Sequence, residues 1–279
     1  MTEQDWATLV DSIRDSDCLV FLGAGASSVL EGQVGLPTGW QLSKKLAEQC
    51  EYPGLEKSDF LRVCQYYELV RDGHRLRKAI KKELDLPHVA PGELHNFIAK
   101  LPVKYVLTTN YDCLMETAFR NAGKQARVII YDIHGTSPQS VEGATKDKPV
   151  VYKLHGTIED LSTMLCTEDD IVQFLACIIL GNPPLLHGIK QLFEDYTMLF
   201  IGYGLRDWNI RTMIRAIRGI NRRDRDWVRS FALQRQKDLS EAAVADWKQS
   251  VMYWDKKENV QCLDTDAIEF VRELARRVM

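Results

Sequence analysis

The chain has 279 residues, of which 45% are hydrophobic and 27% are charged, a balance typical of globular proteins. Its 36 Lys and Arg against 39 Asp and Glu give a net charge of −3, which argues against nucleic-acid binding by bulk electrostatics but leaves room for a local basic patch. The length favours one large domain with a smaller subdomain.

The sequence carries no recognisable targeting segment or membrane span. Residues 1–17 lack the basic region and apolar stretch of a signal peptide, and the longest apolar run, FLACIIL at 174–180, is far shorter than a bilayer span. The seven cysteines are scattered without a CxxC pair, a pattern typical of a reducing compartment. We therefore expect a soluble, cytoplasmic protein without a zinc site.

The first hundred residues contain one strand pattern among helical ones. Residues 2–14 have apolar positions at helical spacing, and CLVFLGAGASS at 18–28 is an apolar run that ends in glycines, as a central parallel strand does. Four helical patterns follow between about 40 and 100, with prolines between them. The patterns are WQLSKKLAEQC, DFLRVCQYYELVRD, RLRKAIKKEL and GELHNFIAKL.

Strands alternate with helices in the remainder of the chain, which predicts a doubly wound, Rossmann-like α/β fold: a parallel sheet with helices on both faces. The blocks at about 40–100 and 160–195 interrupt the alternation, so one or both should form a smaller helical subdomain within a single domain, 1–279. The predicted strands are KYVLTTN (104–110), ARVIIY (126–131), VVYKLHG (150–156), TMLFIGYG (197–204), VRSFALQ (228–234) and SVMYW (250–254). The predicted helices lie at 112–123, 207–219, 240–249 and 265–279.

A glycine-rich loop follows the first strand. Ligands of such sheets bind at the carboxyl ends of the strands, and Gly23, Ala24, Gly25 and Ser27 stand at this one. Paired glycines let a backbone approach a phosphate, and loop amides can bind it, although such a loop also serves any tight turn. The third glycine of the dehydrogenase fingerprint is missing, so a nicotinamide dehydrogenase is a poor fit.

Polar residues also follow three later strands. The structural alternatives are helix capping for the Asn and Asp residues and a core role for the histidine, yet packing gives no reason for all of them to meet at one edge of a sheet. The residues are Thr109, Asn110 and Asp112 after the second strand, His155 after the fourth, and Gly202, Gly204, Asp207 and Asn209 after the fifth.

The ordered blocks FLGAGASS, GLP (35–37), TTNYD, KLHG and FIGYGLRDWNI resemble the sirtuin (silent-information-regulator) family, in particular its bacterial branch found in anti-phage defence. The resemblance spans roughly residues 18–215. It implies that Asn110 and Asp112 organise the nicotinamide-ribose pocket of NAD and that His155 is the catalytic base. It implies further NAD contacts from Gly23, Ala24, Gly25, Ser27, Pro37, Thr109, Gly202, Gly204, Asp207 and Asn209.

Two departures argue against lysine deacylation, the activity of many sirtuins. The family's deacylases carry two CxxC pairs that hold a structural zinc, which this chain lacks. They also follow Gly-x-Pro with Asp-Phe-Arg, whereas Thr38, Gly39 and Trp40 stand here. The chemistry that both departures leave in place is the cleavage of NAD.

We therefore predict a NAD glycohydrolase that uses NAD as its substrate and releases nicotinamide and ADP-ribose. An imidazole with an unperturbed pKa of about 6.5 suits His155 to accept a proton from a ribose hydroxyl or from water. The alternatives are a NAD-dependent protein deacylase or ADP-ribosyltransferase, and a non-catalytic module that binds NAD or ADP-ribose. The residues do not distinguish hydrolysis from cyclisation.

The resemblance also implies an NAD-depleting effector of abortive infection. Because a constitutive NADase would kill its host, we expect control by a homo-oligomer or by a separate sensor, such as a HerA-type ATPase or an Argonaute-like protein. Residues 174–186 are a candidate contact surface or else a plain buried helix. The spacing of Arg211, Arg215, Arg218 and Arg222 predicts one basic helix face, either solvated or used by a partner; direct nucleic-acid binding and membrane binding are not expected.

Overall fold

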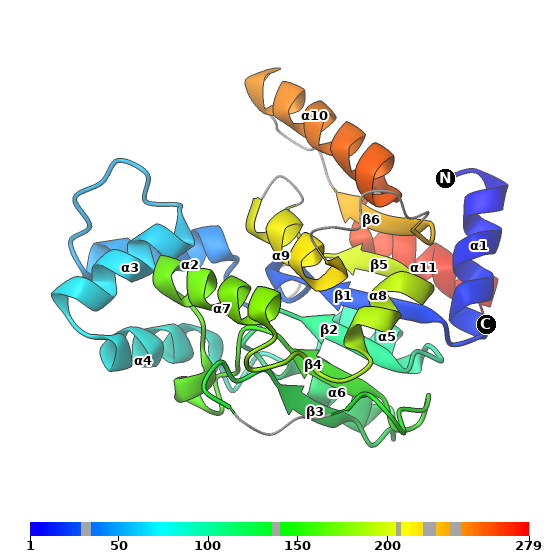
Figure 1. The fold of residues 1–279 in the computed structure, drawn as a ribbon, viewed down its shortest axis with the longest axis horizontal. Helices are drawn as coiled ribbons and strands as arrows, with labels where there is room; N and C mark the ends of the chain where they lie inside the picture. The colour runs from blue at the N-terminus through cyan, green and yellow to red at the C-terminus, as the bar shows by residue number, and fades with distance from the viewer. Residues whose placement is uncertain (29–34, 136–139, 205–207, 220–226, 235–240, 279) are drawn as a thin grey trace.

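The computed structural model describes residues 1–28, 35–135, 140–204, 208–219, 227–234 and 241–278. Seven strands run through these residues: β1 (Cys18–Leu22), β2 (Tyr105–Thr108), β3 (Arg127–Ile130), β4 (Val150–Lys153), β5 (Thr197–Ile201), β6 (Ser230–Gln234) and β7 (Val260–Asp264). They form one sheet in the order β3-β4-β2-β1-β5-β6-β7, with every pair parallel (Figure 1).

The sequence of β1 shows why the sheet is buried on both faces. All five of its residues are buried, and successive side chains of a strand face opposite sides of the sheet. Phe21 packs against Phe193 and Phe200 on one side, whereas Val20 belongs to the hydrophobic cluster on the other. A strand that contributes to two cores must be apolar throughout, which explains the continuous run CLVFL.

Helices cover both faces of the sheet and confirm the predicted doubly wound α/β fold (Figure 1). Arg277 reaches Glu3 at 3.0 Å and so ties the two ends of the chain together. One face carries α1 (Glu3–Arg14), α5 (Glu93–Lys100), α6 (Leu114–Asn121) and α11 (Ala267–Val278), and the other carries α7 (Glu168–Leu180), α8 (Ile189–Asp195), α9 (Trp208–Arg218) and α10 (Glu241–Glu258).

Three helices, α2 (Gly39–Gln49), α3 (Phe60–Val70) and α4 (Gly73–Leu84), form a separate cluster beside the sheet (Figure 1). Their shared core also takes in Ile158, Met164 and Cys166 from the loop after β4. The cluster is smaller than the predicted blocks at about 40–100 and 160–195, because α5, α7 and α8 bury their apolar faces on the sheet.

The predicted strand at 250–254 is wrong, because these residues lie within α10. Trp254 and Glu258, one helical turn apart, are both buried, whereas Met252 is 53% exposed. The last strand is β7, which follows at the edge of the sheet. A short apolar run does not by its periodicity distinguish a strand from one turn of a half-buried helix.

The predicted basic face of the helix after Asp207 is also wrong for Arg218. Arg218 is buried in α9, where its guanidinium donates to Glu258 at 2.7 Å and lies over the ring of Trp227. Arg211 lies over the ring of Tyr253, and Arg222 falls outside the described residues. No helix among the described ranges is long and apolar enough to cross a lipid bilayer.

The predicted contact surface at 174–186 has mixed burial. Phe174, Cys177 and Ile178 of α7 pack into the core, while Ile179 and Leu180 are 54% and 78% exposed. An ion pair also anchors the start of this helix to α4, because the Arg77 guanidinium reaches Asp170 at 3.1 Å. The helix is therefore neither wholly buried nor wholly free.

Candidate functional site

The loops after β1 and β5 meet where the strand order reverses, because the chain continues from β1 to one side and from β5 to the other. In open α/β sheets this is the position of the ligand crevice. The Gly23 amide donates to the Ile201 carbonyl at 2.9 Å, and the Gly25 amide donates to the Gly202 carbonyl at 2.9 Å. The glycine loop and the end of β5 are therefore joined directly.

Glycines are required here by the close contact between the two loops. A Cβ at Gly202 would lie 2.2 Å from the Ala26 nitrogen, and the φ of Gly202 is +79°, which L side chains rarely adopt. A Cβ at Gly23 would lie 2.7 Å from the Gly202 carbonyl oxygen. Since the amides of Gly23 and Gly25 already bond within the protein, two of the amides expected to meet a phosphate are not available.

Asn110, just past β2, is held in one orientation by the β1 loop. Its Nδ2 donates to the Gly23 carbonyl at 3.0 Å and lies 3.3 Å from Ser27 Oγ, while its backbone amide donates to Thr108 Oγ1 at 2.9 Å. Because a backbone carbonyl can only accept, these bonds fix which end of the side-chain amide is the donor. Among the described residues, none donates to the side-chain oxygen, Asn110 Oδ1.

The network continues into His95, which the sequence analysis missed. This histidine is buried in α5, and its Nε2 lies 3.3 Å from Ser27 Oγ. Burial lowers the pKa of His95, and the charge of Asp112 opposes that shift. Its Nδ1 is buried with no hydrogen-bond partner among the described residues. In the sequence, GELHNFIAKL reads only as an amphipathic helix, so nothing in it pointed to the site.

Tyr203 links the ends of three strands and was also missed. Its hydroxyl donates to the Leu22 carbonyl at 2.8 Å, and it lies 3.0 Å from Thr109 Oγ1 and 3.3 Å from the Thr109 amide. Burial raises the pKa of the Tyr203 phenol, so the hydroxyl stays protonated. The predicted residue Thr109 is thus tied to β1 and β5.

His155 comes directly after β4 and is held by an aromatic contact. Its ring packs edge-on against Phe174, with 5.1 Å between ring centroids and an interplanar angle of 87°. Neither ring nitrogen makes a hydrogen bond to a described residue. Burial lowers the pKa of His155 to about 4, an effect opposed by the charge of Asp170. The imidazole is therefore neutral near pH 7 and has one ring nitrogen that can accept a proton, but the lowered pKa makes it a weaker base than the unperturbed imidazole expected from the sequence.

The sharp turn after this histidine has a geometric cause. Gly156 has a φ of +86°, and a Cβ at this position would lie 2.1 Å from the Thr163 carbonyl oxygen. The loop is closed by the Leu165 amide, which donates to the His155 carbonyl at 3.0 Å. Only glycine fits the turn, so the strand ends with the imidazole at its tip.

The sheet register relates His155 to Asn110. Thr108 of β2 pairs with Lys153 of β4, so Asn110 and His155 each lie two residues beyond the same rung of the sheet. Within the described part of the chain no hydrogen bond joins their side chains. The register therefore places both residues just past the carboxyl ends of adjacent strands, the edge where ligands of such sheets bind.

Asp112 lies just before α6, whose N-cap residue is Cys113. Its Oδ1 accepts from the Leu114 amide at 3.0 Å at the start of α6. Its side chain also borders a cavity of about 310 Å³, together with Leu36, Ile158 and Glu159.

The other predicted site residues vary in placement. Ala24 and Gly204 are exposed, Pro37 is partly buried in the segment before α2, Asn209 lies in the first turn of α9, and Asp207 is outside the described residues. Among the described side chains, no group of three or more His, Cys, Asp or Glu is arranged to hold a metal ion.

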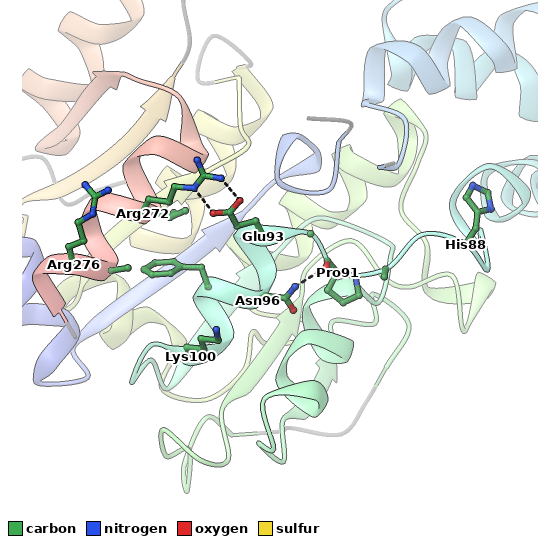
Figure 2. Close-up of a pocket in the computed structure, with 12 residues that line it drawn as sticks. His88, Pro91, Glu93, Asn96, Lys100, Arg272 and Arg276 are labelled. Atoms are coloured by element: carbon green, nitrogen blue, oxygen red, sulfur yellow. Dashed lines mark hydrogen bonds and ion pairs between the residues drawn. The ribbon is translucent and has the colours of Figure 1, made fainter. Parts of the chain in front are cut away.

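A larger groove of about 800 Å³ lies elsewhere, between α5 and α11 (Figure 2). None of the predicted site residues lines it. Its most prominent charges are already paired, since Arg272 donates twice to Glu93, at 2.6 and 2.7 Å, and Arg276 lies 3.2 Å from Glu273. The strand-end site and this groove are separate features of the molecule.

The parallel sheet and the loops that meet at its switch point define a Rossmann-like α/β protein with a candidate site at the carboxyl ends of its strands. Residues 104–263, more than half of the chain, match the SIR2-like domain. The chain belongs to the SIR2-like family, which confirms the resemblance seen in the sequence.

Three relatives show how far the similarity extends. The chain is 26% identical over 218 residues to the NAD(+) hydrolase ThsA of Bacillus cereus (strain MSX-D12), covering 76% of this chain and 42% of that protein. It is 26% identical over 259 residues to the NAD(+) hydrolase ThsA of Cytobacillus dafuensis (91% and 49%) and 26% identical over 222 residues to Defense-associated sirtuin 2 of Bacillus subtilis (77% and 20%). The chain thus spans less than half the length of each of these relatives.

Proposed function

We propose that this protein hydrolyses NAD to nicotinamide and ADP-ribose. The observation that carries the proposal is the pair at neighbouring strand ends: a neutral imidazole that makes no hydrogen bond to a described residue, and an asparagine whose side-chain amide nitrogen is held by the Gly23 carbonyl. The family match and the names of two of the relatives, NAD(+) hydrolases, support NAD as the substrate.

In the proposed reaction the bond between C1′ of the ribose and the nicotinamide nitrogen breaks, and its electron pair leaves with nicotinamide. The oxygen of a water molecule bonds to C1′, and His155 accepts the proton that this water, or a ribose hydroxyl, gives up. Asn110 orients the ribose or the water through its side-chain oxygen, to which no described residue donates. Holding the reacting groups in place and excluding other water supplies much of the rate enhancement.

Product analysis tests this proposal. The purified chain is incubated with NAD, and nicotinamide, ADP-ribose and cyclic ADP-ribose are separated by chromatography. We expect nicotinamide and ADP-ribose in equal amounts, and loss of both in His155→Ala. The matched control is His88→Ala, an exposed histidine outside the strand-end site. Equal NAD consumption by the wild type and His155→Ala would contradict the proposal, as would a product that appears only when an acylated peptide or a protein acceptor is added.

We also propose a role as the NAD-depleting component of an anti-phage system, controlled by oligomerisation or by a separate sensor chain. The support is the similarity to Defense-associated sirtuin 2. Cells that carry the gene with its genomic neighbours should lose NAD after phage infection, and cells that carry His155→Ala should not. NAD levels that stay equal in the two strains would contradict this role.

A further inference from the structure

A buried lysine lies at the end of β4, two residues before His155. Lys153 is the last residue of β4, and its side chain is only 1% exposed. Its ammonium donates to the Asp112 backbone carbonyl and to Glu116 Oε1, the latter at 3.0 Å. Lysine is almost never fully buried unless it is paired, because removing an ammonium from water is costly. Lys153 therefore differs from the apolar residues that fill most core positions, because its burial depends on paired polar groups.

The partners of Lys153 join the two loops that carry Asn110 and His155. The Asp112 carbonyl is two residues past Asn110, and Lys153 is two residues before His155. The same loops are also linked through their backbones, by the bond from the Ile158 amide to the Tyr111 carbonyl at 3.0 Å. Lys153 adds to these links a hydrogen bond from its buried ammonium to the Asp112 carbonyl.

Glu116 offsets the free-energy cost of burying the Lys153 ammonium. It lies in the first turn of α6, is 9% exposed and carries the charge opposite to that of the ammonium. The carboxylate neutralises the lysine, while the second bond of the lysine goes to a main-chain carbonyl in the loop before α6. The two bonds therefore have different tasks: one balances charge, and the other fixes the position of the loop.

We propose that Lys153 is a positioning residue for NAD cleavage: its bond to the Asp112 carbonyl sets the separation between the Asn110 loop and His155. This inference rests on the proposed function. A displacement of about 1 Å between reacting groups can cost about a hundredfold in rate, so the loss of this bond should lower the turnover number without abolishing NAD binding.

Three variants separate positioning from stability. Lys153→Met removes the bond and leaves Glu116 buried without its partner. Lys153→Met/Glu116→Met replaces the pair with apolar side chains of similar length, a change that is often neutral for stability. Glu116→Gln removes the opposite charge but keeps the lysine and its bond to the Asp112 carbonyl.

We expect kcat to fall about tenfold to a hundredfold in both variants that lack Lys153, with KM changed less than about threefold. Glu116→Gln should keep kcat within about threefold of the wild type, even where its melting temperature drops. If kcat instead follows melting temperature across the set, so that the double variant regains both, Lys153 is only structural and the proposal is overturned. Should Lys153→Met not fold, the double variant carries the test.

Hydrogen–deuterium exchange gives a readout that does not depend on activity. The amides of residues 109–113 should exchange faster in both variants that lack Lys153 and at the wild-type rate in Glu116→Gln. Unchanged exchange in the lysine variants would overturn the proposal even if their turnover fell. A wild-type chain that fails to cleave NAD would count against the proposed function, while the exchange result would still show whether Lys153 holds this loop.

Discussion

Asn110 and His155 stand at the ends of neighbouring strands, yet the protein holds them in different ways. The Asn110 amide bonds to the Gly23 carbonyl and contacts Ser27, which in turn contacts the buried His95. The His155 ring rests on Phe174, and within the described residues its nitrogens bond to no protein group. The contrast is between a side-chain amide that is oriented by hydrogen bonds and an imidazole that is placed by packing against an aromatic ring.

The largest effect should come from removing the fixed amide. Asn110→Ala should lower kcat for NAD cleavage by at least about a hundredfold, because an oriented polar group at a reaction centre contributes on this scale. The melting temperature should change little, since the residue is only partly buried. Steady-state kinetics that follow nicotinamide release measure kcat. A loss of less than fivefold would mean that Asn110 does not take part in catalysis.

The next effect concerns the contact between Gly202 and the glycine loop that holds the Asn110 side chain. Gly202→Ala should destabilise the fold by about 2–4 kcal/mol, because its Cβ would meet the Ala26 nitrogen at 2.2 Å and its φ of +79° disfavours alanine. The matched control is Gly123→Ala, where φ is +76° and nothing lies within 4 Å of the added atom. That variant should lose only about 1 kcal/mol. Urea denaturation measures both, and equal losses would show that the loop contact is unimportant.

The pKa of His155 predicts how stability depends on pH. In the unfolded chain this histidine titrates near 6.5, and burial lowers its pKa to about 4 in the fold. As pH falls from 6.5 to 4, the unfolded state therefore binds a proton that the folded state does not, and stability declines by up to about 3 kcal/mol. His155→Gln should lack this decline, while the contribution of His95 is common to both proteins. Denaturation curves at pH 7 and 4.5 that shift equally in both proteins would contradict the assignment.

The smallest effect should come from loosening the packing under His155. Phe174→Leu should cost about 1–2 kcal/mol of stability and lower kcat by less than about tenfold, because the imidazole keeps its chemistry but loses its aromatic support. Arg272→Ala, which breaks an exposed ion pair in the separate groove, should cost no more than about 1 kcal/mol and leave kcat unchanged. Equal kcat in Phe174→Leu and Arg272→Ala would show that this contact does not position the base.

The sequence predicted the fold and the strand-end residues for a definite physical reason. Strands buried on both faces are continuous apolar runs, and parallel strands deliver whatever follows them to one edge of the sheet. Thr109, Asn110 and His155 could therefore be assigned to that edge from their distance past an apolar run. The family match over residues 104–263 then confirmed the resemblance, and it covers the blocks TTNYD, KLHG and FIGYGLRDWNI.

Residues whose roles depend on tertiary packing could not be predicted in this way. His95 reaches the site because α5 packs under the β1 loop, and Lys153 matters because of what surrounds its ammonium. The strand predicted at 250–254 is wrong for a related reason, since Trp254 is buried from a helix, where its ring packs against Phe200 of β5. Local patterns indicate where a chain is apolar, but they do not indicate which distant side chain will meet it.

The most direct test is a structure of Asn110→Ala with uncleaved NAD bound. We expect the nicotinamide ribose to lie between positions 110 and 155, with a His155 ring nitrogen about 3 Å from a ribose hydroxyl or from a water molecule next to C1′. NAD seated in the groove between α5 and α11, or a ribose that His155 cannot reach directly or through one water molecule, would contradict it.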